Sequence, residues 1–213
     1  MAEKSEFAYR QPQPNRAKRL VKEALALAHD EKLFEAVPVV EQAIRLDQLN
    51  ALNQFCYLRA EICAAVGDEK PRLAITLYGH AIQCKRKGRY RDAKVAYLEA
   101  HTLDPVFLWP ANNYAWLLAT ATVPSVRDGK EALKYAMLLC KRSRFNCWAF
   151  LGTLAAAYAE AGDFGKAIGW QTSALELAPA GNKLDALLEL RHYQAGRAYI
   201  DEGSPVAAGG EGE

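Results

Sequence analysis

The sequence lacks any long apolar run and any strong excess of charge. No window approaches the roughly 18 uninterrupted apolar residues of a membrane span, and no apolar stretch follows the first basic residues, as a secretory leader requires. Lysine and arginine number 27 against 25 aspartates and glutamates, so the net charge of +2 selects neither nucleic acid nor an anionic membrane. These absences predict a cytoplasmic protein that does not bind membranes.

Side chains that carry chemistry are also few. No glycine-rich loop follows a strand to hold phosphate, and no serine stands at a strand-to-helix elbow. The four histidines are expected on different helices, and His80 falls on an apolar stripe, which predicts a core position. The five cysteines fall mostly on apolar faces, which predicts free thiols in a reducing compartment. We therefore expect no catalytic activity, no cofactor and no metal site.

What the sequence has in abundance is apolar periodicity of the helical kind. Hydrophobic residues make up 51% of the 213 residues, enough for a continuous core. The clearest pattern spans residues 148–181, where two amphipathic helices are predicted on either side of Gly162. Gly162 can take the positive φ that ends one helix, and Pro179 cannot continue the next. Ala155 and Ala167 are expected where the two helices cross, because small side chains let the axes approach.

The same stretch resembles the signature of tetratricopeptide repeat (TPR) proteins. The positions that carry the resemblance are Leu151, Leu154, Ala155, Tyr158, Gly162, Ala167, Ala174 and Pro179. The resemblance implies an all-α fold, a right-handed α-solenoid of antiparallel helix hairpins with about nine or ten helices and a C-terminal capping helix. From NNYAWLLAT to YQAGRAY the chain is also similar to a segment of bacterial TPR proteins, which implies a bacterial origin.

The repeat pattern divides the chain into an array, an arm, a cap and a tail. The array contains four hairpins and an extra helix: 17–50, 74–107, 108–147, 148–181 and, for the extra helix, 51–73. Residues 1–16 are expected to form a flexible arm, 182–202 a capping helix and 203–213 a disordered tail. We expect the extra helix at 51–66 to pack on the helix at 71–87 and to kink the superhelix.

Two later helices have signals of their own. Asp128 and Glu131 form a predicted capping box at the start of a helix. The capping helix is predicted from Lys183 to about Ile200, with Glu189 facing water and leucines covering the last hairpin. These leucines are Leu184, Leu187, Leu188 and Leu190.

In TPR proteins the first helix of each hairpin lines a concave groove, so the resemblance implies a set of groove residues here. They are Lys18, Lys22, Tyr78, Ile82, Lys85, Asn112, Asn113, Trp116, Thr120, Gly152, Thr153 and Ala156. The asparagines suit an extended backbone, whereas the carboxylate clamp of some TPR domains is disfavoured, since no basic residues stand one repeat after Asn113. The expected function is a non-catalytic scaffold that binds a peptide or helix of a partner protein. For Trp116, a position in the core is the alternative.

Two other functions stay open. A basic ridge suits the phosphates of nucleic acid or an acidic partner, with Tyr90 beside it to stack on a base. The ridge consists of Lys85, Arg86, Lys87, Arg89 and Arg91. The same cations complement the dipole at a helix C-terminus, which explains them without a ligand. Self-association through the extra helix pair or the capping helix is the third hypothesis.

Overall fold

The structure is a computed structural model that describes residues 13–46 and 54–202. The expected tail and most of the expected N-terminal arm lie outside these ranges. Within them the chain forms α-helices and two short 3-10 turns, with no strand. The α-helices are α1 (Pro14–His29), α2 (Leu33–Leu46), α3 (Gln54–Ala65), α4 (Lys70–Arg86), α5 (Tyr90–Leu103), α6 (Leu108–Thr120), α7 (Gly129–Arg142), α8 (Trp148–Glu160), α9 (Phe164–Leu177) and α10 (Lys183–Gln194).

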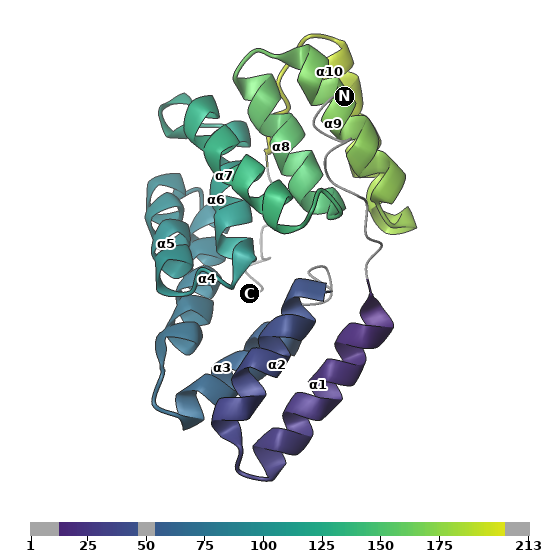
Figure 1. The fold of residues 1–213 in the computed structure, drawn as a ribbon. Coiled ribbons are helices and arrows are strands. Elements are labelled where there is room, and N and C mark those ends of the chain that lie inside the picture. Colours follow the sequence, from purple (N-terminus) through teal and green to yellow (C-terminus); the bar gives the residue numbers. More distant parts are fainter. Residues whose placement is uncertain (1–12, 47–53, 203–213) are drawn as a thin grey trace, which may run out of the picture.

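Consecutive helices pack side by side along the array (Figure 1). The pairs α1 and α2, α4 and α5, α6 and α7, and α8 and α9 form hairpins, and α10 packs on α9. α3 lies between α2 and α4, while α6 also packs on α8. In Figure 1 the helices follow one another from α1 at the bottom of the view to α10 at the top. The chain is therefore an all-α solenoid, which confirms the predicted fold class.

Small residues and turn conformations explain the hairpins. Ala155 in α8 and Ala167 in α9 are fully buried, as expected for residues at a helix crossing. Gly162 between these helices has a φ of +85°, a conformation that a Cβ atom makes costly. The side chain of Asp128 accepts the backbone N–H of Glu131 at 3.0 Å and caps α7, which is one half of the predicted capping box. The Asp128 N–H donates instead to the carbonyl of Leu118 at 2.9 Å.

The buried apolar side chains form two clusters. The larger cluster runs from α4 to α10, and Tyr97, Phe150 and Tyr193 are among its fully buried aromatic residues. The smaller cluster joins α1, α2 and α3 to Ala74 of α4 and to Phe107 before α6. All five cysteines are buried and free, which confirms their predicted state.

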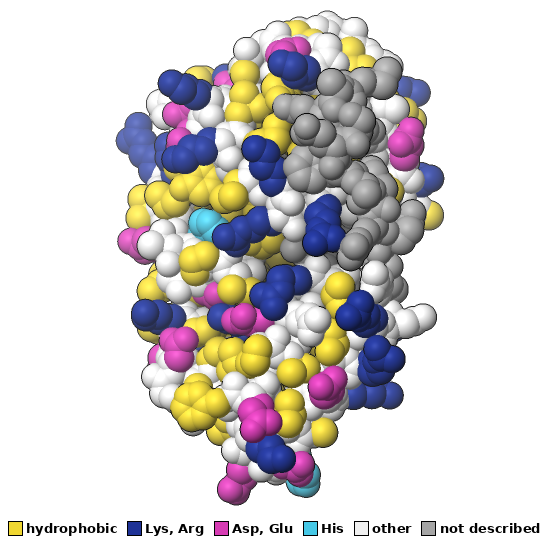
Figure 2. All heavy atoms as spheres, viewed as in Figure 1, with side chains coloured by type: hydrophobic (Ala, Val, Ile, Leu, Met, Phe, Trp, Pro, Cys, Tyr) yellow, Lys and Arg dark blue, Asp and Glu magenta, His cyan; other side chains and the backbone are white. Residues whose placement is uncertain are grey.

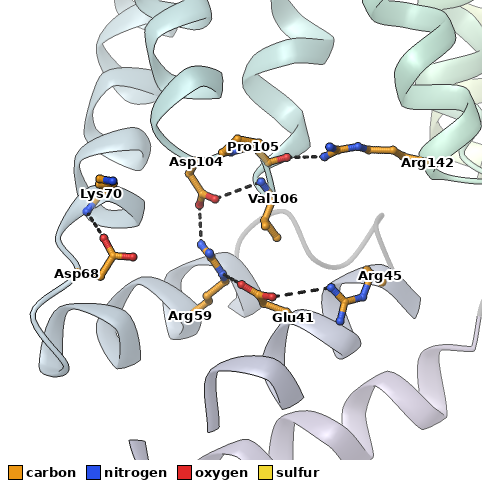
Figure 3. Close-up of polar contacts among 9 residues, drawn as sticks. All are labelled: Glu41, Arg45, Arg59, Asp68, Lys70, Asp104, Pro105, Val106 and Arg142. Carbon is orange, nitrogen blue, oxygen red and sulfur yellow. Dashed lines mark hydrogen bonds and ion pairs between the residues drawn. The ribbon is translucent and has the colours of Figure 1, made fainter. Parts of the chain in front are cut away.

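A buried arginine links the N-terminal helices to the rest of the array (Figure 3). Arg59 of α3 donates through Nε to Glu41 of α2 at 2.8 Å and through Nη1 to Asp104 after α5 at 2.7 Å. Asp104 also accepts the backbone N–H of Val106 at 3.2 Å. Burial raises the pKa of Asp104, while the Arg59 charge acts in the opposite direction. These contacts join α2, α3 and the turn between α5 and α6.

The C-terminal helix is shorter than predicted. α10 ends at Gln194 rather than near Ile200, because Gly196 turns the chain with a φ of +68°. The backbone N–H of Arg197 then bonds to the carbonyl of His192 at 3.0 Å and completes the helix end. Residues 195–202 are therefore not helical, and they are named the strap from here on.

The predicted faces of α10 and of α4 also need correction. The buried residues of α10 are Ala186, Leu190 and Tyr193. Leu184 is 67% exposed and Leu188 is 44% exposed, so these leucines do not cover the last hairpin. His80 is likewise exposed on α4 and not in the core, because the buried stripe of that helix runs through neighbouring alanines. Among the described residues, no helix has both the length and the apolar content needed to cross a bilayer.

Candidate functional site

The polar residues predicted for the groove lie on neighbouring helices and bond to one another. Asn112 of α6 and Thr153 of α8 are buried, and the Thr153 hydroxyl donates to Asn112 Oδ1 at 2.9 Å. Asn113 Nδ2 donates to the Tyr78 hydroxyl of α4 at 3.0 Å. Burial raises the pKa of Tyr78 to about 12, so this phenol stays protonated at neutral pH. The two contacts satisfy polar groups that helix packing removes from water.

The strap returns from α10 to the helices that carry these residues. Asp201 Oδ2 accepts the indole N–H of Trp116 in α6 at 2.8 Å, and it lies 2.7 Å from Lys85 Nζ in α4. The backbone N–H of Asp201 donates to the carbonyl of Thr120 at 2.8 Å. Thr120 is the last residue of α6, where carbonyls have no partner within their own helix. α4 and α6 together therefore hold a carboxylate and a piece of backbone from the strap.

Aromatic contacts of Tyr199 also hold the strap in place. The ring centroid of Tyr199 lies 6.1 Å from that of Trp116 and 5.5 Å from that of His192 in α10. Both distances fall within the range of favourable aromatic pairing. Ala198 and Tyr199 are half-buried against the larger cluster. We call Lys85, Trp116 and Thr120, which receive Tyr199 and Asp201, the strap site.

A second polar contact lies between α9 and α10. Gln171 Nε2 donates to Glu189 Oε2 at 2.7 Å and to the carbonyl of Ala186 at 2.9 Å. Burial raises the pKa of Glu189 to about 7, although the hydrogen bond from Gln171 lowers it. A Cβ atom on Gly152 of α8 would lie 3.9 Å from Glu189 Oε2, so this glycine faces the same contact. The prediction that Glu189 faces water is therefore wrong. Its carboxyl points into the molecule, because Gln171 gives it a buried donor.

Other predicted groove residues do not join this arrangement. Lys18 and Lys22 are exposed on α1, which packs on α2, and the described contacts do not bring them to α6. Ile82 of α4 is half-buried against the larger cluster, and Ala156 of α8 is buried in it. The two lysines therefore lie on the surface of the array, and Ile82 and Ala156 belong to its core packing.

The five residues of the basic ridge do not share one environment in the structure. Lys85 turns toward Asp201, whereas Arg86, Lys87, Arg89 and Arg91 are exposed. Arg89 Nε also bonds to Asp92 Oδ2 at 2.6 Å. Figure 2 shows Lys and Arg side chains spread over the visible face, with apolar and acidic side chains between them.

The described part of the chain contains a surface hollow but no cluster of metal ligands. No three His, Cys, Asp or Glu side chains there gather into a metal site. A hollow of about 580 Å³ lies beside α7 and α8, and Glu131, Lys134 and Tyr158 are among the residues that line it. No serine, threonine, cysteine or histidine lines this hollow, and it shares no residue with the strap site.

Sequence reasoning missed the strap and the contact between Gln171 and Glu189. Gly196 marks the helix end that releases the strap, and that signal was present in the sequence. The contact of Asp201 with Lys85 spans 116 positions, so no local pattern reports it.

Comparisons with known proteins support the fold. No protein-family model matches the chain, and no curated protein matches it. Among solved structures, the chain is similar to the crystal structure of the P58(IPK) TPR domain, with 15% sequence identity and a TM-score of 0.50. The match covers 86% of this chain and 47% of that one, so the chain spans about half the length of its structural neighbour. The protein therefore has a TPR-like fold.

Proposed function

We propose that the protein is a non-catalytic scaffold that binds an extended segment of a partner protein along α4, α6 and α8. The observation that carries this proposal is the strap, since α4 and α6 already receive a non-helical segment of protein chain. The TPR-like fold supports the same reading, because stacked hairpins create extended binding surfaces.

The chemistry of the strap site favours a peptide over a small metabolite. Lys85 supplies a positive charge, Trp116 supplies an aromatic surface with an N–H donor, and Thr120 supplies a backbone acceptor. These groups match a side-chain carboxylate, an aromatic side chain and a backbone N–H, which a polypeptide carries together.

The test is a selection of short random peptides displayed on phage against two forms of the full chain. One form is unaltered, and the other carries Tyr199→Ala and Asp201→Asn, here named the strap variant. Selected peptides should bind much more weakly when Asn113→Ala and Trp116→Ala are introduced. Val95→Ala is the matched control, because Val95 is 56% exposed on α5 and outside the strap site.

Selection of peptides that bind equally well with and without Asn113 and Trp116 would contradict the proposal. So would the absence of any enriched peptide on both forms of the chain.

The sequence left two alternatives, and the structure bears on each. An adaptor for nucleic acid or an acidic partner would use the ridge without Lys85, since that residue is paired with Asp201. Neutralising Arg86 and Arg91 tests this adaptor, because they are exposed. A self-associating subunit would use the exposed leucines of α10, such as Leu184 and Leu188, and light scattering at two concentrations tests it.

A bacterial origin and a cytoplasmic location remain parts of the proposal. The first is supported by the resemblance of the second half to bacterial TPR proteins. The second is supported by the reducing environment that five free thiols suit.

A further inference from the structure

The strap is held by contacts that another polypeptide can make. Lys85 and Trp116 bind a carboxylate, Trp116 also contacts an aromatic ring, and the Thr120 carbonyl accepts a backbone N–H. Each contact depends on the chemistry and spacing of the bound segment. None of them depends on the covalent link to α10.

The spacing within the strap defines the pattern that the site accepts. Side chains two positions apart lie on the same side of an extended segment. Tyr199 and Asp201 have this spacing, and both contact Trp116. Ile200 lies between them and is half-buried. An aromatic residue followed two positions later by a carboxylate is therefore the pattern that fits.

The strap is seated loosely enough to be replaced. The side chains of Lys85 and Asp201 keep 29% and 20% of their exposure, so water reaches their ion pair. Gly196, Arg197 and Glu202 are exposed, and segments with few buried contacts open before the core does. α10 packs on α9 independently of the strap, so the array stays capped when the strap leaves.

We propose that this face binds a segment of a partner protein in which an aromatic residue is followed two positions later by aspartate or glutamate. The partner segment displaces Tyr199 and Asp201 from Trp116 and Lys85. This inference rests on the proposed function and adds the chemistry of the partner. A different protein is the source, because each copy of this chain already fills its own site with its own strap.

The probe is a fluorescent synthetic peptide with the strap sequence, Ala-Gly-Arg-Ala-Tyr-Ile-Asp-Glu, and its anisotropy is measured with the full chain. A strap that fills its site for about nine-tenths of the time lowers the apparent affinity about tenfold. We therefore expect the strap variant to bind the probe about tenfold more tightly than the unaltered chain. A probe with asparagine in place of aspartate should bind about fivefold more weakly, because it loses a charge-assisted contact.

A charge exchange separates recognition from a purely structural role of Lys85. In the strap variant, Lys85→Glu should abolish binding of the aspartate probe and restore binding of a probe with lysine at that position. Lys87→Glu is the matched control, since it changes the same charge at an exposed place at the end of α4. Circular dichroism of each variant checks that the helices remain folded.

Several outcomes would overturn the inference. These are equal affinities for the aspartate and asparagine probes, equal affinities of the unaltered chain and the strap variant, or no effect of the charge exchange. If the probe experiments fail in one of these ways but displayed peptides still depend on Asn113 and Trp116, only this inference falls and the proposed function stands. If the displayed peptides fail as well, both proposals fall. Dimers formed by exchange of straps between copies, seen by light scattering, would contradict a different protein as the source.

Discussion

At the scale of single residues, Arg59 shows how much depends on one buried charge. It bonds to Glu41 and Asp104 on two other parts of the chain, and it is only 8% exposed. Removing one partner leaves the remaining charges buried without an opposite charge. That costs more free energy than the intact ion pair contributes to stability. A surface arginine with a similar contact gives the comparison, and Arg72 bonds to Glu61 at 2.7 Å on the exposed surface of α4.

We expect Arg59→Met to lower the free energy of unfolding by about 3 to 5 kcal/mol, because Asp104 and Glu41 lose their shared cation. Arg72→Met should leave the urea midpoint nearly unchanged. Urea unfolding followed by circular dichroism measures both. Equal midpoints for the two variants would show that the contacts of Arg59 do not stabilise the fold.

Glu189 predicts a pH dependence of stability. Burial raises its pKa from 4.5 to about 7, so near pH 6 the folded chain holds a proton that the unfolded chain has released. Stability must therefore fall as the pH rises from about 4.5 to about 7. Burial is the largest cause of this rise; the hydrogen bond from Gln171 opposes it, and the charges of Asp185 and Asp201 contribute to it.

The measurement is urea unfolding between pH 5 and pH 8 for the unaltered chain and for Glu189→Gln. The unaltered chain should lose up to roughly 3 kcal/mol more than the variant over this range. The variant keeps the shape of the side chain and removes its titration. Parallel pH profiles for the two proteins would contradict the inward position of Glu189.

At the scale of the elements, backbone conformation decides where hairpins turn. Gly162 and Gly169 form a matched pair, since both are exposed and a Cβ atom at either would meet nothing within 4 Å. They differ in conformation, because Gly162 has a φ of +85° at the turn and Gly169 lies within α9. An added Cβ atom therefore has room at both positions. Any difference between the two alanine substitutions comes from the backbone conformation.

We expect Gly162→Ala to destabilise the protein by about 1 to 2 kcal/mol, the cost of a left-handed alanine. Gly169→Ala should stabilise it by about 0.5 to 1 kcal/mol, because alanine favours a helix over glycine. Thermal and urea unfolding of both variants give the sign of each effect. A stabilising Gly162→Ala would mean that the turn does not hold a left-handed residue in solution.

The element scale also shows where helix prediction succeeds. α7 begins where Asp128 was expected to cap it, because a cap depends on residues three positions apart. α10 ends earlier than its leucines suggested, because Gly196 interrupts an apolar pattern that continues beyond it. Leu184 and Leu188 then point to solvent, since the last hairpin meets Ala186 and Leu190.

At the scale of the whole molecule, the two clusters differ in extent. The larger one is continuous from α4 to α10, while the smaller one joins α1, α2 and α3 to Ala74 and Phe107. Solenoid stability depends on contacts between neighbouring units, so an end with fewer buried contacts opens more easily.

Hydrogen exchange followed by mass spectrometry should therefore detect faster exchange in α1, α2 and α3 than in α6 and α8. Arg59→Met should widen this difference, because Arg59 links α3 to Asp104. Arg72→Met again serves as the control. Uniform protection from α1 to α10 would indicate one cooperative unit in place of two.

The sequence by itself determined that this protein is an array of helical hairpins. Apolar spacing, small crossing residues such as Ala155 and turn residues such as Gly162 act over a few positions, so local patterns report them. Only the tertiary structure decided which distant side chains meet. Asn112 reaches Thr153 across 41 positions, and Asp201 reaches Lys85 across 116, because stacking places successive first helices side by side. The strap site exists for the same reason, since the strap returns from α10 to contact α4 and α6.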